Sequence, residues 1–197
     1  MFWSYNFNQS ENDPQNYYFF NEGFNKEELK TIDEGIKKLK LKKATTVGEG
    51  DDSIRSSKIR WIPQDNEWWW LYERLSNQIQ EANNALWKFD LHHIPEQIQF
   101  TEYYATEKGH YTWHQDIGPG ILSRRKISIT VQLSDPSEYE GGELQMWSGG
   151  HENNVTTAYK GAGSTFIFPS YMMHRVTPVT KGVRKSFVLW VGGSHYR

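Results

Sequence analysis

The second half of the chain, after Pro95, constrains the fold more than any other feature. It divides into eight short segments rich in β-branched and aromatic residues, separated by glycine, proline and other turn residues. The segments are IQFTEYY, GHYTWH, KISITVQLS, GGELQMW, VTTAYK, STFIFP, MMHRVTP and KSFVLWVGG. In the third, Ile127, Ile129, Val131 and Leu133 alternate with polar residues, which is the pattern of a half-buried antiparallel strand. This half therefore predicts a jelly roll of two antiparallel sheets.

The first half predicts helices that brace this jelly roll. Residues 25–43 place apolar side chains at helical spacing, with Asn25 as a suitable N-cap, and a second helix is expected over about 67–87. At least one of the three tryptophans at 68–70 must face a partner element or a cleft, because three consecutive residues cannot share one helix face. Residues 1–22 predict an irregular or edge-strand arm, and IRSSKIRWIP predicts a short strand.

The predicted fold class is therefore mainly β with N-terminal helices, a double-stranded β-helix (jelly roll) of two antiparallel sheets braced by two helices. A chain of 197 residues has the length of one domain. We expect a single domain over 1–197, in which 1–95 form the N-terminal arm and supporting helices and 96–193 the catalytic core.

Composition excludes several classes of protein. The net charge is -2 with Lys and Arg dispersed, which argues against a nucleic-acid partner. The chain has no cysteine, so any metal must be held by His, Asp or Glu. No apolar run approaches the length of a membrane span, and the N-terminus lacks the pattern of a signal peptide. We expect a cytoplasmic monomer that does not bind a membrane.

The stretch HYTWHQDIGPG suggests a metal site. His114 and Asp116 are two residues apart, so on an extended strand they point to the same side. His174, in SYMMHRVTP, lies in another predicted strand, where a buried histidine needs a partner. Two His and one carboxylate form the facial triad of non-haem Fe(II) oxygenases. The competing interpretation is that His174 is a satisfied core histidine and His114 caps a strand end.

Arg184 favours the metal interpretation. It follows His174 by ten residues and lies in the aromatic and β-branched stretch KSFVLWV, where an arginine is costly to bury without an anion. In a two-sheet jelly roll the connection between them can place the two side chains on facing walls. A five-carbon dicarboxylate that chelates the metal at one end would then reach the guanidinium at the other.

These residues resemble a known family. His114-x-Asp116, followed by His174 in HRVTPVTKGVR with Arg184 ten residues on, resembles the Fe(II)/2-oxoglutarate-dependent dioxygenases of the prolyl 4-hydroxylase superfamily. The stretches LSDPSEYEGGELQMW and FIFPSYMMHRVTPVTKGVR are especially similar to the bacterial and phage branch of PKHD-type hydroxylases. The resemblance covers about residues 96–193.

The resemblance implies roles for particular residues. His114, Asp116 and His174 fall on the iron ligands, and Arg184 falls on the residue that pairs with the distal carboxylate of 2-oxoglutarate. Other positions that the resemblance assigns are Tyr103, or alternatively Tyr104, and Trp190 near the co-substrate, and Tyr111 and Arg125 at the peptide substrate. The implied cofactors are Fe(II), 2-oxoglutarate and O2, with ascorbate as a reductant.

The predicted function is hydroxylation of an unactivated C–H bond, on a prolyl residue of a peptide or protein partner. Two alternatives stay open at this point. One is a jelly-roll binding module that holds a metal without turnover, which would not need Arg184 inside the barrel. The other is a zinc hydrolase on the same His2Asp set, in which Glu107 or Glu143 would have to act as the general base.

Overall fold

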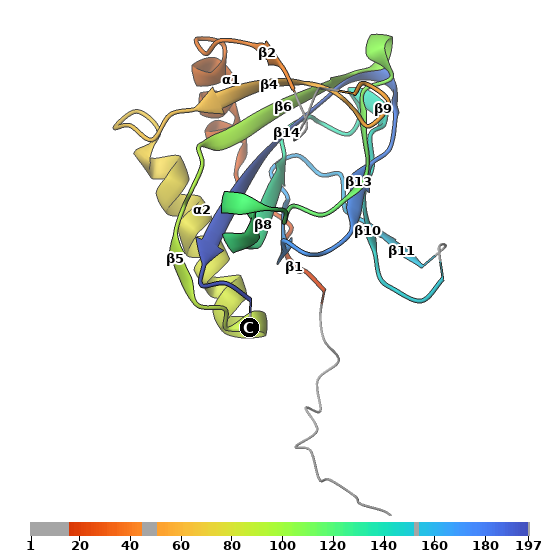
Figure 1. Cartoon of the computed structure of the whole chain (residues 1–197). Helices are drawn as coiled ribbons and strands as arrows, with labels where there is room; N and C mark the ends of the chain where they lie inside the picture. Colours follow the sequence, from red (N-terminus) through yellow and green to blue (C-terminus); the bar gives the residue numbers. More distant parts are fainter. Residues whose placement is uncertain (1–15, 45–50, 152–153, 197) are drawn as a thin grey trace, which may run out of the picture.

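Two antiparallel sheets make up most of the protein, as the sequence predicts (Figure 1). The computed structural model describes residues 16–44, 51–151 and 154–196, so most of the predicted N-terminal arm lies outside the described residues. In spatial order the larger sheet contains β1 (Tyr18–Phe20), β12 (Thr165–Pro169), β8 (Arg125–Gln132), β14 (Val179–Gly193), β6 (Ile98–Tyr104), β4 (Lys58–Ile62) and β2 (Lys42–Lys43). Two further strands, β5 (Leu91–His93) and β9 (Tyr139–Gly141), also pair with β14. The smaller sheet contains β11 (Val155–Thr157), β10 (Leu144–Trp147), β13 (His174–Val176), β7 (His110–His114) and β3 (Arg55–Ser56).

The first half of the chain supplies more than helices. Strands β1, β2 and β4 extend the larger sheet, and β3 joins the smaller sheet beside β7. The sequence predicted an edge strand in the arm and one short strand near residue 60. The pairing of β3 with β7 was not predicted, because it depends on contacts far apart along the chain.

Helix α1 (Lys26–Ile36) begins where the sequence places it. The Asn25 side chain accepts hydrogen bonds from the backbone N–H groups of Glu27 and Glu28, and Glu28 accepts one from the Asn25 backbone, which completes a capping box. The expected continuation to residue 43 is wrong, since α1 ends at Ile36 and Lys42–Lys43 form β2. The Leu-Lys-Leu-Lys run at 39–42 has the two-residue period of a strand, and β2 pairs with β4.

Helix α2 (Trp69–Ala82) is followed by a π-helical turn (Asn83–Trp87), where one continuous helix was expected. The Asn83 side chain diverts the backbone there, because it bonds both the N–H and the C=O of Phe89. Trp68 packs against α1 so closely that a Cβ on Gly35 would lie 2.7 Å from its ring. This confirms that one of the three tryptophans faces a partner element, whereas Trp69 is 67% exposed.

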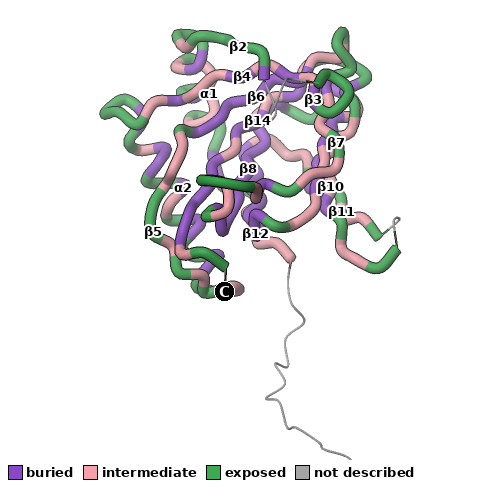
Figure 2. The backbone as a smooth tube through the Cα atoms, in the orientation of Figure 1, coloured by how far each residue is buried: buried purple, intermediate pink, exposed green. Residues whose placement is uncertain are grey.

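The two helices lie on one side of the larger sheet and the smaller sheet lies on the other (Figure 1). Strand β8 is therefore buried along its whole length, and the expectation of a half-buried strand is wrong (Figure 2). Its apolar residues join the core that includes Leu71 and Leu75 of α2. Burial of each such side chain contributes about 1.5–3 kcal/mol. Its polar residues face the opposite way, into the space between the sheets. None of the helices within the described ranges combines the length and the apolarity needed to cross a membrane.

Candidate metal centre

Three side chains of the types that bind metals meet between the two sheets. His114 ends β7, His174 begins β13, and the two are paired in register, with ring centroids 4.1 Å apart. Asp116 follows two residues after β7, where its backbone N–H donates to the Ser170 carbonyl at 2.9 Å. One potential ligand atom from each residue lies within 4.8 Å of the others. The sequence spacing was thus a correct guide, although the strand ends before it reaches Asp116.

Both imidazoles are oriented by backbone carbonyls. Nδ1 of His114 lies 2.8 Å from the Thr112 oxygen, and Nδ1 of His174 lies 2.9 Å from the Met172 oxygen. Because a carbonyl only accepts, each Nδ1 carries the proton and each Nε2 presents a lone pair. These Nε2 atoms lie 3.8 and 3.6 Å from the Asp116 carboxylate. Both rings therefore present their unprotonated nitrogen toward the same point.

The charge states suit a cation. Burial and the neighbouring His174 lower the pKa of His114 to about 3, so its ring is neutral near pH 7. Burial alone would raise the pKa of Asp116, but the two histidines and the Ser128 hydroxyl together hold it below its usual value. That hydroxyl donates to Asp116 Oδ2 at 2.6 Å. Two neutral imidazoles and an ionised carboxylate are the protonation states that bind a divalent metal ion.

Arg184 lies in the same cavity but comes from the larger sheet. It is 1% exposed, and its Nη1 donates to Ser186 Oγ at 3.2 Å. Its Nε has no hydrogen-bond partner, and no carboxylate of the described residues forms an ion pair with its guanidinium. Burial lowers the pKa of Arg184, which the nearby phenols of Tyr103 and Tyr139 oppose. The cavity thus has an anionic metal-ligating end and a cationic end on facing sheets.

Comparison with known proteins identifies this arrangement. Residues 98–192 match the family model described as the 2OG-Fe(II) oxygenase superfamily. This segment belongs to that superfamily. The matched part contains the triad and Arg184, so the donor set of this chain fits the Fe(II) and 2-oxoglutarate that the family name implies.

Relatives with similar sequences are PKHD-type hydroxylases, which supports the PKHD branch. One from Azoarcus sp. strain BH72 is 34% identical over 70% of this chain and 61% of its own length. One from Nitrosomonas europaea is 37% identical over 50% of this chain and 45% of its own length. The matches thus span about half the length of these curated relatives.

Solved structures of 2OG oxygenases share the fold. A prolyl-4-hydroxylase from Pseudomonas putida superposes with a TM-score of 0.71 at 20% identity, covering 91% of this chain and 93% of that one. A prolyl hydroxylase from Trichoplax adhaerens, solved with a hypoxia inducible factor peptide fragment, gives 0.73 at 16% identity over 90% and 84%. At these identities the likeness establishes the jelly-roll fold alone.

The residues that the resemblance assigns to the co-substrate lie in the cavity. Tyr103 is buried, and Cζ of Arg184 lies 5.4 Å from its ring centroid. Tyr104 faces the opposite side of β6, where Lys58 Nζ lies 4.6 Å from its ring. Trp190 lines the cavity beside the triad. Between the two tyrosines, the geometry therefore favours Tyr103.

The two residues assigned to the substrate have different surroundings. The Tyr111 ring stacks on His114, with centroids 3.5 Å apart. Arg125 forms a partly buried ion pair with Glu96 and donates to the Asp116 carbonyl at 3.0 Å, and its Cζ lies 3.8 Å from the Trp190 ring centroid. The charge of Arg125 is thus already paired, and its side chain braces Asp116 and Trp190.

Two residues at the site were not predicted from the sequence. Ser128 orients Asp116 from the polar face of β8, and the alternation along that strand was a signal that could have indicated it. Arg55 of β3 is buried in the cavity wall, with neutral partners, Ser57 Oγ at 2.9 Å and Gln99 Oε1 at 2.7 Å. Its Cζ lies 4.8 Å from the Tyr111 ring. No local pattern around Arg55 indicates this position.

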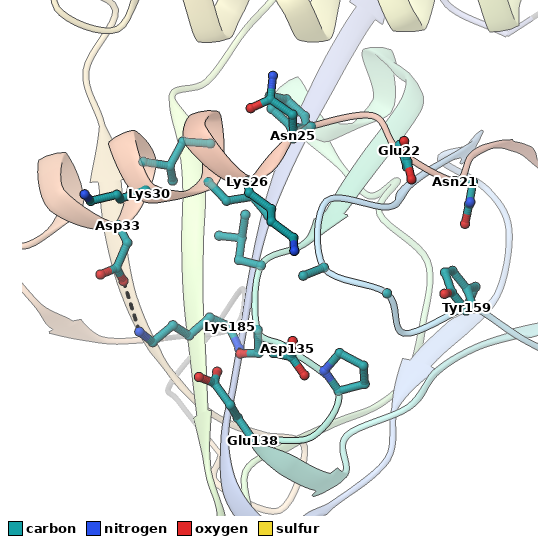
Figure 3. Close-up of a pocket in the computed structure, with 18 of the residues that line it drawn as sticks. Asn21, Glu22, Asn25, Lys26, Lys30, Asp33, Asp135, Glu138, Tyr159 and Lys185 are labelled. Atoms are coloured by element: carbon teal, nitrogen blue, oxygen red, sulfur yellow. Dashed lines mark hydrogen bonds and ion pairs between the residues drawn. The ribbon is translucent and has the colours of Figure 1, made fainter.

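The free space at the site is small. It amounts to about 40 Å³, roughly the room for one water. A larger hollow of about 820 Å³ lies beside α1, but it contains no triad residue (Figure 3). Its charges are of both signs, and Lys185 pairs there with Asp33 at 3.1 Å. Donor chemistry, rather than volume, distinguishes the metal centre.

Proposed function

We propose that this chain is an Fe(II)- and 2-oxoglutarate-dependent hydroxylase that acts on an unactivated C–H bond. His114, Asp116 and His174 would hold the iron, and three coordination positions would stay open. Bound Fe(II) and 2-oxoglutarate supply the oxidising chemistry with O2. The protein holds the ligands in one protonation state, orients the co-substrate and excludes water from the space between the sheets.

One observation carries this proposal. Arg184 is a buried cation that faces the triad from the opposite sheet and has no carboxylate partner among the described residues. Leaving a buried charge unpaired costs several kcal/mol, and an anion that binds there recovers much of that cost. A dicarboxylate with one end at the metal and the other at Arg184 would neutralise both ends of the cavity.

The two alternatives lack comparable support. A binding module that uses the metal only for structure gives no reason to bury Arg184. A zinc hydrolase needs a general base beside the metal, but Glu107 forms an ion pair with Lys58 at 2.7 Å and Glu143 accepts from Gln145 at 2.9 Å. Neither glutamate is among the residues that line the cavity.

We further propose that the substrate is a prolyl residue of a peptide or protein. The support comes from the solved relatives, one called a prolyl-4-hydroxylase and one bound to a peptide fragment. Aromatic side chains in the cavity wall, Tyr111 and Trp190, suit packing against a proline ring. We expect ascorbate to act as an auxiliary reductant and the whole chain to work as a single-domain monomer.

Anaerobic titration with Fe(II) and then 2-oxoglutarate tests the proposed function. A weak visible metal-to-ligand charge-transfer band is expected when the co-substrate chelates the iron. Peptides with and without proline can then be screened for succinate formation. Absence of the band when Fe(II) is demonstrably bound would contradict the oxygenase proposal.

A further inference from the structure

Polar atoms without hydrogen-bond partners are concentrated around Arg184. In native proteins nearly all buried polar groups are paired, so such a concentration needs an explanation. Near Arg184 the buried atoms without a partner are Thr101 Oγ1, both amide atoms of Gln132, the Tyr139 hydroxyl and Arg184 Nε, whereas Trp190 Nε1 lies beside Asp116 at the metal end and Gln78 Oε1 and Thr165 Oγ1 lie outside the cavity. Thr101 and Gln132 are both paired in register with Ser186, which bonds Arg184. Five of the eight buried unpaired atoms of the described residues thus lie at the cationic end of the cavity.

Tyr139 is a member of this group to which the sequence analysis assigned no role. It lies on β9, in register with Gly182 of β14, and is 2% exposed. The turn that follows β9 packs on the Arg184 stem, because a Cβ on Gly142 would lie 3.0 Å from Arg184 Cδ. Gly142 also has a φ of +57°, which favours glycine. Tyr139 is therefore fixed against Arg184 by the backbone of β9 and its turn.

The groups around Tyr139 make its hydroxyl a donor in need of an acceptor. Burial raises the pKa of Tyr139, an effect that Arg184 partly opposes through its charge and a hydrogen bond to the phenol oxygen, so the phenol stays protonated near pH 7 and its proton is free to be donated. Lys160 Nζ lies 4.5 Å from the ring centroid and itself donates to the Gly141 carbonyl. Arg184 and Lys160 are cations, which cannot accept a hydrogen bond, and the nearby carboxylate of Glu143 already accepts from Gln145 at 2.9 Å.

We propose that Tyr139 forms part of the site for the distal carboxylate of 2-oxoglutarate. Its hydroxyl donates to a carboxylate oxygen that Arg184 pairs with, so that Arg184 Nε and the phenol are satisfied by the same anion. This inference rests on the proposed function. It adds a second phenol to Tyr103 and places it on β9, whose following turn packs on the Arg184 stem.

The test compares Tyr139→Phe with wild type and with Tyr159→Phe, a control at an exposed tyrosine. The charge-transfer band measures the affinity of the Fe(II)-loaded protein for 2-oxoglutarate. We expect Tyr139→Phe to require about tenfold more 2-oxoglutarate, the loss typical of one hydrogen bond to a charged group. Fe(II) affinity should not change. The melting temperature of the metal-free variant should change little, because the deleted hydroxyl is in contact only with the Arg184 guanidinium and donates to no described residue.

A second probe separates binding of the distal carboxylate from a structural role. The compound 2-oxopentanoate keeps the chelating end of 2-oxoglutarate and lacks the distal carboxylate. Wild type and Tyr139→Phe should bind it equally weakly. Wild-type affinity of Tyr139→Phe for 2-oxoglutarate would overturn the inference, and so would an equal loss for both compounds or a lower melting temperature with weaker Fe(II) binding. Failure of wild type to give a band with 2-oxoglutarate would instead contradict the proposed function, and this inference with it.

Discussion

Arg184 and Lys185 are adjacent cations on β14 that differ in burial and in their ion-pair partners. Arg184 points between the sheets, is almost fully buried and has no carboxylate partner among the described residues. The Lys185 side chain is 36% exposed and points to the other face of the sheet, where it pairs with Asp33 of α1 (Figure 3). One charge is neutralised by the chain itself, and we propose that the other is neutralised by a ligand. We infer that in this protein an unpaired buried charge is a better guide to a ligand site than the size of a hollow.

The largest effect is expected from a substitution that weakens the metal site, where the other end of the dicarboxylate would bind. His174→Ala should weaken Fe(II) binding by at least about 100-fold, because it deletes one of three ligands. Anaerobic metal titration measures this. His110→Ala is the matched control, since His110 lies on β7 but bonds the Lys108 and Ser53 carbonyls. Equal Fe(II) affinity of the two variants would contradict the assignment of His174 as a metal ligand.

Neutralising each cation in turn tests whether Arg184 binds a ligand and Lys185 does not. Arg184→Met should raise the 2-oxoglutarate concentration needed for the charge-transfer band by about 100-fold, since a charge-assisted bidentate pair is lost. It should not destabilise the ligand-free protein, because the deleted charge is unpaired there.

Lys185→Met should show the reverse pattern. Its 2-oxoglutarate affinity should stay within a factor of two, and its free energy of unfolding should fall by no more than about 1 kcal/mol, the usual range for a partly exposed ion pair. Urea unfolding measures the second quantity. Similar effects of the two substitutions on 2-oxoglutarate binding would contradict the proposal that Arg184, unlike Lys185, binds the co-substrate.

Acid should selectively weaken the metal end of the cavity. The pKa of His114 is about 3 in the folded protein and 6.5 as its reference value, so the unfolded chain binds the extra proton between these values. The contribution of His114 to the free energy of unfolding of the metal-free protein should therefore be complete above about pH 6.5 and be lost as the pH drops toward 3. The slope from this group approaches about 1.4 kcal/mol per pH unit. Urea midpoints between pH 7 and 4 should vary less in His114→Asn, and an equally steep profile would contradict this assignment.

The smallest effect is expected from a substitution that gives Arg55 a carboxylate partner, as Lys185 already has. Gln99→Glu places a carboxylate where the Gln99 oxygen now lies, 2.7 Å from Arg55 Nη2. It should raise the free energy of unfolding by up to about 1 kcal/mol, since Arg55 now has only neutral partners. Gln97→Glu, at an exposed position nearby, is the control. A lower urea midpoint for Gln99→Glu than for Gln97→Glu would show that Arg55 needs no anion.

The sequence predicted those features whose signals are local. The spacing of His114 and Asp116, the strand around His174 and the N-cap at Asn25 depend on a few neighbouring residues, and the geometry of each agrees with its signal. The alternation in β8 was recognised, but its polar face was assigned to solvent because one strand does not reveal what covers it. Arg55 and Tyr139 reach the cavity region through strand pairings between distant segments. No local pattern indicates such pairings, so these residues required the structure.

The order of strands in the larger sheet also limits how the chain can be shortened. Strand β6, which carries Tyr103, lies between β14 and β4, and β4 precedes the segment that matches the family model. A fragment cut to residues 98–192 would leave the backbone N–H and C=O groups on one side of β6 without a neighbour. Such an open edge readily recruits strands from other molecules. Strand β4 therefore protects β6 from pairing with strands of other molecules, and a minimal expression fragment would have to retain β4.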